Sequence, residues 1–203
     1  PQTAKLSSPT QLGTDTTWVG TAGDQGGAFA VKTNGTFWSW GYNLEGYLGL
    51  NDRTSRSSPT QVGTDTTWAS GFGKYDKSGT LSAAIKTNAT LWTWGNNDYG
   101  KLGHNNTDTR YSSPTQVGTD TTWNQVYTSY THIVATKTDG TLWAWGENNW
   151  GQLGQNSKGD ANRKSSPTQI GTDTTWSLDN VYNGTQGANL TCAAKTDGTL
   201  WSW

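Results

Sequence analysis

The 203 residues carry 14 basic and 15 acidic side chains, so the net charge is −1 and no strong field recruits nucleic acid or an anionic membrane. A single cysteine excludes an intramolecular disulfide framework and a multi-cysteine zinc site. No apolar run approaches the roughly 20 residues that a bilayer-spanning helix needs. We therefore expect neither nucleic-acid binding nor membrane insertion.

Two phrases repeat along the chain and organise it. The phrase SSPTQ(L/V/I)GTDTTW begins at four serines, which are Ser7, Ser57, Ser112 and Ser165. The phrase KTDGTLWAWGENNWGQLG at 137–154 has full counterparts at 32–49 and 86–103 and a short one at 195–203. All 13 tryptophans except Trp150 occupy repeat positions. Tryptophan at fixed intervals indicates packed structure although only 31% of the residues are hydrophobic.

After residues 1–6, each repeat predicts four short strands. The first is the SPTQ segment, whose proline cannot donate to a ladder and therefore belongs on an edge. The second opens with the tryptophan of TDTTW, and the third is a short apolar run such as AFAVK. The fourth is the W-x-W segment, whose spacing places both tryptophans on one face.

A tight turn joins the third and fourth strands of each repeat. Asn-Gly and Asp-Gly pairs predict a two-residue hairpin in which both central residues have positive φ. Ala89 replaces the glycine in one copy, which predicts a strained or different turn there. Two residues before the repeat lysine the residue is always alanine, which predicts a crowded inner strand where neighbouring units converge.

Four antiparallel strands per repeat predict an all-β fold, a β-propeller of about four four-stranded blades. A solenoid is the alternative, although solenoid repeats are usually shorter or helical. The expected blades are 14–63, 64–118, 119–171 and 172–203. The last blade lacks its outer strand, and residues 8–13 are a spare copy of that strand. We expect this segment to complete the last blade, either in the same chain or in a neighbouring one.

The predicted core combines the W-x-W tryptophans with the alanine column. Its members are Trp38, Trp40, Trp92, Trp94, Trp143, Trp145, Trp201, Trp203, Ala30, Ala84, Ala135 and Ala193.

The segment W-G-x-N-x-x-G-x-L-G, at 40–49, 94–103 and 145–154, resembles the repeat of the regulator of chromosome condensation family. The resemblance covers nearly the whole chain and implies a β-propeller. That family builds seven-bladed rings, so the array is compatible with a part of a larger ring. Its members include a nucleotide-exchange factor for a GTPase, a plant ultraviolet-B photoreceptor and many propellers that only present loops to partners. The G-W-R-H-T motif of the photoreceptor is absent here, as are the acidic loop and wedge of the exchange factor.

The pattern of polar residues indicates structural roles and not catalytic ones. Asp15, Asp65, Asp120 and Asp173 share one phrase, which predicts a turn cap copied by duplication. His104 and His132 have no recurring His, Cys or carboxylate beside them, so structural roles are expected. No carboxylate pair stands out from the repeat, and no nucleophile elbow or phosphate loop is present. We therefore predict no enzyme, no catalytic or metal-binding residue and no cofactor.

The positions where the repeat varies are the candidates for binding. Five residues after the second tryptophan of W-x-W stand Glu45, Tyr99 and Trp150, in a loop on one rim. Aromatic side chains there suit stacking on a sugar ring or anchoring of a protein, unless they pack against the adjacent blade.

These observations predict a non-catalytic structural or protein-interaction propeller, whose partner is another protein or a second copy joined through blade closure. A glycan-binding propeller is the alternative, and a GTPase-regulating propeller is the third hypothesis. Near-identical repeats with few charges, no methionine and one cysteine favour an extracellular, cell-surface or virion setting over the cytoplasm.

Overall fold

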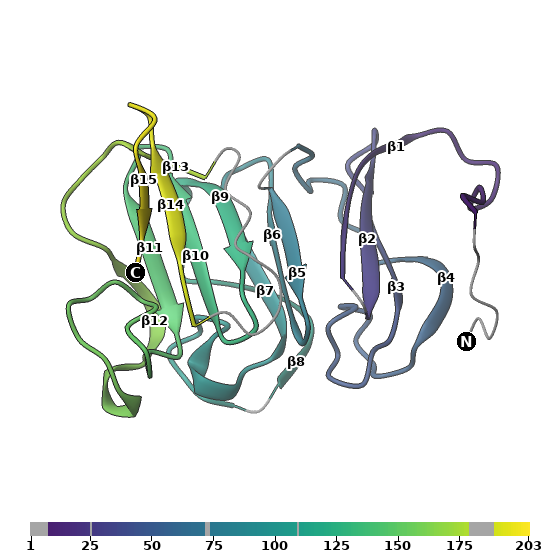
Figure 1. Cartoon of the computed structure of the whole chain (residues 1–203). Coiled ribbons are helices and arrows are strands. Elements are labelled where there is room, and N and C mark those ends of the chain that lie inside the picture. The colour runs from purple at the N-terminus through teal and green to yellow at the C-terminus, as the bar shows by residue number, and fades with distance from the viewer. Residues whose placement is uncertain (1–7, 25, 72–73, 109, 179–188) are drawn as a thin grey trace.

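The computed structural model describes residues 8–24, 26–71, 74–108, 110–178 and 189–203, which form an all-β array of antiparallel sheets (Figure 1). The first sheet contains β1 (Trp18–Gly23), β2 (Gly27–Lys32), β3 (Phe37–Gly41) and β4 (Arg56–Gln61). The second contains β5 (Tyr75–Ser78), β6 (Leu81–Ile85), β7 (Leu91–Asn96) and β8 (Arg110–Gln116). The third contains β9 (Trp123–Thr128), β10 (His132–Lys137), β11 (Leu142–Gly146) and β12 (Lys164–Gln169). The fourth contains β13 (Trp176–Ser177), β14 (Cys192–Lys195) and β15 (Leu200–Ser202).

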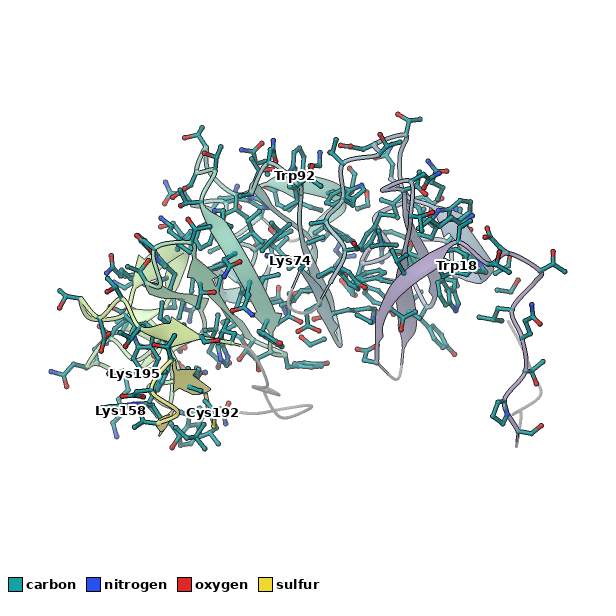
Figure 2. The ribbon with its side chains drawn as sticks, turned by 90° about the horizontal axis from the view of Figure 1, so that it is seen from above. Trp18, Lys74, Trp92, Lys158, Cys192 and Lys195 are labelled. Atoms are coloured by element: carbon teal, nitrogen blue, oxygen red, sulfur yellow. The ribbon has the colours of Figure 1, made fainter. Side chains whose placement is uncertain are left out.

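Strands that follow one another in the chain pair within each sheet, and the sheets stand side by side as successive propeller blades (Figure 1). Seen from above, the blades fan out in an arc, with Trp18 near one end, Lys74 and Trp92 in the middle and Lys195 at the other end (Figure 2). The two 3-10 turns, η1 (Asp98–Gly100) and η2 (Asp160–Asn162), lie in loops. No helix among the described residues is long and apolar enough to cross a bilayer.

The first strand of each sheet lies at the inner edge of the arc, because β5 contacts both β1 and β9. The proline-containing strands β4, β8 and β12 form the opposite, outer edges, where a missing N–H is tolerated. The alanine column lies in the second strand from the inner edge. The expectation that these alanines occupy the inner strand is therefore wrong, although each is buried as a crowded position requires: Ala30, Ala84, Ala135 and Ala193.

The tryptophans of W-x-W differ in burial. Trp94 and Trp145 are fully buried, because each packs between two sheets. Trp201 is 47% exposed, which contradicts its predicted place in the core. The remaining W-x-W tryptophans are half-buried: Trp38, Trp40, Trp92, Trp143 and Trp203.

The hairpin turns differ from the prediction in their backbone. Positive φ falls only on the second residue of each pair, as at Gly35 with φ of 75° and Ala89 with φ of 59°. The Lys32 N–H donates to the Thr36 carbonyl at 3.1 Å, so the hairpin loop contains three residues, one more than predicted. The Asn34 carboxamide oxygen accepts hydrogen bonds from the backbone and the hydroxyl of Thr36. Ala89 adopts the left-handed conformation that the other copies give to glycine, so this turn carries the expected strain.

Each turn also joins its sheet to the next one. In the three internal junctions the carbonyl of the turn residue accepts a hydrogen bond from the N–H of the tryptophan that opens the following repeat. The pairs are Gly35 with Trp68 at 3.2 Å, Ala89 with Trp123 at 3.1 Å, and Gly140 with Trp176 at 3.0 Å. Successive blades are therefore linked by backbone as well as by apolar contacts.

Among the described residues, β15 pairs only with β14, so the last sheet has three strands. Residues 8–13 belong to no strand and lie at the opposite end of the array from β15 (Figure 1). The expectation that they complete the last blade within the same chain is wrong. The physical reason is the arc, which leaves its two ends far apart.

Candidate functional site

The rim loop after each of the first three W-x-W strands is built around one buried asparagine. The Asn43 side-chain oxygen accepts a hydrogen bond from the Leu48 N–H at 2.9 Å, and its amide nitrogen donates to the Asp52 carbonyl at 3.0 Å. Asn97 and Asn148 hold their loops in the same way. The repeated asparagine is therefore a loop clamp, and it fixes the backbone that presents residues 45, 99 and 150.

Two of these three rim residues contact an arginine from the next sheet. The Glu45 carboxylate pairs with the Arg110 guanidinium at 3.3 Å. The Arg163 guanidinium lies over the Tyr99 ring, 5.2 Å from its centroid. Arg110 is the first residue of β8 and Arg163 lies directly before β12, so the rim position of one blade is covered by residues at the start of the outer strand of the following blade. Packing between blades is the structural role of Glu45 and Tyr99.

Trp150 differs from its two counterparts because its side chain is 68% exposed. Its loop is nevertheless held in place, since the Trp150 N–H donates to the Gln152 side-chain oxygen at 2.9 Å. Gln152 itself is buried and lies at the junction with the fourth sheet, where its carbonyl accepts a hydrogen bond from the Trp203 indole at 3.0 Å. The result is an indole that is exposed to solvent on a supported loop.

Every blade also contains a lysine held between two tryptophans and an aspartate, which sequence reasoning did not find. In the first blade the Lys32 ammonium lies 4.6 Å from the Trp18 ring centroid and 4.0 Å from that of Trp38, and it pairs with Asp15 at 2.5 Å. The equivalent lysines are Lys86, Lys137 and Lys195. The only indication of this contact in the sequence was that the lysine and the aspartate recur in every repeat. These contacts within the blade occupy the lysine ammonium, so it is not available to bind a ligand.

The aspartate of this cluster has two tasks. Its side chain caps the following turn, as predicted, because Asp15 accepts a hydrogen bond from the Thr17 N–H at 2.9 Å. The hydrogen bond from Lys32 and those from Thr17 hold the pKa of Asp15 well below its usual range. In the last blade the equivalent contacts with Lys195 and Thr175 lower the pKa of Asp173 to about 2.

A second charged group lies at the inner edge, where the first strands meet. Lys77 is buried and pairs with Asp24 at 2.5 Å, and Asp24 also accepts the Gly79 N–H. Asp76 accepts hydrogen bonds from the Thr128 N–H at 2.7 Å and from its hydroxyl at 3.1 Å. Burial raises the pKa of Asp76 to about 6. These carboxylates tie β5 to the neighbouring sheets, and we assign them a structural role.

His132 also connects two structural elements. His132 is fully buried, and its Nε2 lies 2.9 Å from the Thr191 hydroxyl in the fourth blade. Burial lowers the pKa of His132 to about 4, so the ring is neutral at physiological pH. Within the described ranges no group of three or more His, Cys, Asp and Glu side chains is arranged to hold a metal ion.

Comparison with known proteins identifies the repeat. The family described as regulator of chromosome condensation (RCC1) repeat matches residues 88–136 and 139–181. The ultraviolet-B receptor UVR8 of Arabidopsis thaliana is 29% identical over 70% of this chain and 31% of its own length. The protein RCC2 homolog of Danio rerio is 37% identical over 39% of this chain and 16% of its own length. The chain therefore spans less than a third of these relatives.

Solved structures show the same fold. Human WBSCR16 superposes with a TM-score of 0.70 at 21% identity, over 92% of this chain and 47% of its own. Yeast RCC1 (Prp20), solved with Kap60, superposes with a TM-score of 0.73 at 17% identity, over 95% of this chain and 45% of its own. At these identities the likeness concerns the fold alone.

Proposed function

Because this chain is built from regulator of chromosome condensation repeats arranged as consecutive β-propeller blades, we propose that it works as a non-catalytic protein-interaction module. The sheets form a rigid support, and the rim loops contact a partner. The observation that carries this proposal is Trp150, an indole that is 68% exposed on a supported loop of the described array, whose fourth sheet has no outer strand like those that cover the equivalent positions of the first two blades. A large aromatic side chain on a supported loop has the properties of an interface anchor.

The similar proteins support partner binding. Prp20p of Saccharomyces cerevisiae has binding properties to Gsp1p and histones, and it has been solved bound to Kap60. A GTPase regulator homolog of Caenorhabditis elegans is also similar to this chain. Regulation of a GTPase is therefore a second form of the same proposal. An assay of nucleotide release from a candidate GTPase tests it, and an unchanged release rate would count against it.

A photo-crosslinking residue at position 150 tests the interaction proposal most directly. The full chain carrying the crosslinker at this position is irradiated with material from its native source, and bound proteins are identified by mass spectrometry. A matched variant carries the crosslinker at position 45, which Arg110 covers. We expect a defined adduct from position 150 that is absent from position 45. Equal labelling at both positions, or at neither, contradicts the proposal.

Glycan binding is the alternative from a different class, favoured by the same exposed indole, because sugar rings stack on aromatic faces. A glycan array distinguishes the two. Binding that disappears in Trp150→Ala while the fold is retained would favour the glycan. An array without signal, together with a protein adduct at position 150, would favour the protein partner.

We also propose an extracellular, cell-surface or virion setting. The support is compositional: near-identical repeats, 14% charged residues, no methionine and one cysteine. Fractionation of the native source with an antibody against this chain tests the setting. Recovery from the cytoplasmic fraction alone would overturn it.

Self-association through blade closure is part of the proposed function. Sheet edges that remain open are sites of pairing with another chain, and β15 has such an edge among the described residues. The mass of the purified chain in solution tests this point.

A further inference from the structure

The hairpin turns of the first two sheets carry the acceptor sequence for N-linked glycosylation. Residues 34–36 (NGT) and 88–90 (NAT) both have the form Asn-x-Thr with no proline in the middle. The third and fourth turns have the same sequence except that Asp139 and Asp197 replace the asparagine. All four of these side chains are exposed. The array therefore presents two possible acceptor turns beside two matched turns that cannot accept a glycan.

Each turn uses only one polar atom of this side chain. The Oδ1 atom accepts hydrogen bonds from the N–H and the hydroxyl of the threonine two residues later. The distances are 3.1 and 2.7 Å at Asn34, 3.2 and 2.8 Å at Asn88, 3.0 and 2.7 Å at Asp139, and 2.9 and 2.7 Å at Asp197. Because aspartate has no Nδ2 atom and forms the same bonds, the turn does not require the amide nitrogen of the asparagines.

The turn by itself favours aspartate over asparagine. Hydrogen bonds to a charged carboxylate are stronger than those to a neutral carboxamide. The bonds from Thr141 hold the pKa of Asp139 below its usual value, so this turn stabilises the charged form. Asparagine is otherwise favoured where φ is positive, but in these turns positive φ falls on the next residue, Gly35 or Ala89. Neither the hydrogen bonds nor the backbone accounts for asparagine in the first two turns.

A third acceptor sequence, at residues 105–107, differs in this respect. Asn105 has a φ of 58°, and its counterparts Asn51 and Asn156 have φ values of 58° and 51°. Neither counterpart begins an acceptor sequence, so the left-handed backbone of this loop accounts for asparagine in all three repeats. At Asn34 and Asn88 the fold accounts for only one of the two polar side-chain atoms.

We propose that Asn34 and Asn88 are N-glycosylation sites, each joined through Nδ2 to an oligosaccharide. In the transfer, Nδ2 forms a bond to C1 of the first sugar, and the bond from C1 to the diphosphate of a lipid-linked donor breaks. The diphosphate leaves with the electron pair, and Nδ2 loses one proton. The transferase acts on chains that enter the secretory route, so the proposal rests on the proposed extracellular or cell-surface setting.

Both sites lie at the end of the sheet opposite the rim loops. The first turn directly precedes β3, which begins at Phe37, and the rim loop follows Gly41 at the other end of the same strand. The second turn and the second rim loop flank β7 in the same way. Glycans at positions 34 and 88 therefore cover the turn face of the first two blades and leave the rim open to a protein partner.

Enzymatic removal of N-linked glycans in water enriched with oxygen-18 tests the sites in the native protein. Peptide N-glycosidase converts a glycosylated asparagine to aspartate and incorporates oxygen from the water. The two sites fall in separate tryptic peptides, 33–53 and 87–101. We expect labelled aspartate at positions 34 and 88. A parallel sample without the enzyme measures spontaneous deamidation of the Asn-Gly pair, and a position without enzyme-dependent label overturns the proposal for that asparagine.

Matched variants test the same turns in the full chain secreted from a eukaryotic cell line. Asn34→Asp and Asn88→Asp introduce the residue of the other two turns, which accepts the same hydrogen bonds, so the fold should be retained. Each variant should lose one glycan, and Asp139→Asn, which creates the sequence NGT at 139–141, should gain one. Gel mobility before and after deglycosylation measures the change. Unchanged mobility of Asn34→Asp and Asn88→Asp, or no gain in Asp139→Asn, contradicts the proposal.

The glycans and the setting can be separated by fractionation of the native source. Chain that is recovered from the extracellular or surface fraction without enzyme-dependent label overturns the glycosylation alone. Recovery of unlabelled chain from the cytoplasmic fraction alone overturns both the glycosylation and the setting. The crosslinking at position 150 depends on neither asparagine, so the interaction function can succeed where this inference fails.

Discussion

The third and fourth blades carry almost the same hairpin, KTDGTLWAW at 137–145 and KTDGTLWSW at 195–203, and bury it differently. Leu142 is fully buried, whereas Leu200 is 74% exposed. The third hairpin has an outer strand on one side and a following blade against its face, and the fourth has neither among the described residues. In this array burial is therefore a property of the junction between units and is not contained in one repeat.

The largest expected effect is the loss of a side chain from a junction. Leu142→Ala should lower the free energy of unfolding by about 2–5 kcal/mol, because it removes buried methyl groups and leaves a cavity. Leu200→Ala, the same change at the same repeat position, should change it by no more than about 0.5 kcal/mol. Denaturant unfolding of the two variants measures the difference. Equal losses would show that the end blade is packed as tightly as the internal one.

The second-largest effect is expected from protonation of Asp76, whose carboxylate joins the second sheet to the third. Its pKa is raised to about 6, against 3.8 for the ordinary carboxyl, so the folded chain binds the proton more tightly than the unfolded chain. Stability should therefore fall as the pH rises from about 4 to about 6, by roughly 2–3 kcal/mol in total. Asp76→Asn should remove this fall while keeping one acceptor for Thr128. A stability profile unchanged by the substitution would contradict the assignment.

The hairpin turns offer a smaller effect with a matched control. Gly140 and Gly198 both have positive φ, so alanine costs roughly 1 kcal/mol at either position through backbone strain. A Cβ on Gly140 would also lie 1.9 Å from the Thr174 carbonyl oxygen, whereas a Cβ on Gly198 would meet open space. Gly140→Ala should therefore destabilise by at least about 1 kcal/mol more than Gly198→Ala. Thermal unfolding compares them, and equal costs would mean that the turn does not bear on the next blade.

At the Ala89 turn, a substitution is expected to increase the stability of the protein. Ala89 has a φ of 59° where the other copies have glycine. Ala89→Gly should raise the free energy of unfolding by up to about 1 kcal/mol, because relief of the strain exceeds the greater entropy of the unfolded chain. Calorimetry of the single variant checks the sign. A loss of stability would show that the Ala89 methyl group packs usefully in the junction with Trp123.

The smallest effect is expected at the clamp of the end blade. The pKa of Asp173 is lowered to about 2, from an ordinary value of 3.8, by its contacts with Lys195 and Thr175. This contribution is present above pH 4 and is lost as the pH falls towards 2, which is opposite in sign to Asp76. Asp173→Asn should remove this contribution, so it should lower stability slightly at neutral pH, leave stability near pH 2 unchanged and thereby flatten the acid limb of the stability profile. The same acid limb in both proteins would exclude a stabilising ion pair there.

The candidate site was only partly accessible to prediction. Variation between repeats located the rim position of Glu45, Tyr99 and Trp150, and a loop was expected there. Only the structure separated Trp150 from the other two, because Arg110 and Arg163 reach the rim from the next blade. The lysine clamps were missed for a related reason: each combines a lysine with a tryptophan and an aspartate that lie at least 14 residues earlier in the chain.

The sequence by itself determined the features that depend on neighbours along the chain. Alternation set the strands, proline marked the outer edge, the Asn-Gly and Asp-Gly pairs marked the turns, and the repeat itself indicated a propeller. Tertiary structure decided the conformation of the turns and the position of the alanine-containing strand within its sheet. It also decided the exposure of Trp201 and the separation of residues 8–13 from β15. These depend on how one blade meets another, because identical short segments gain or lose burial and hydrogen bonds according to what packs beside them.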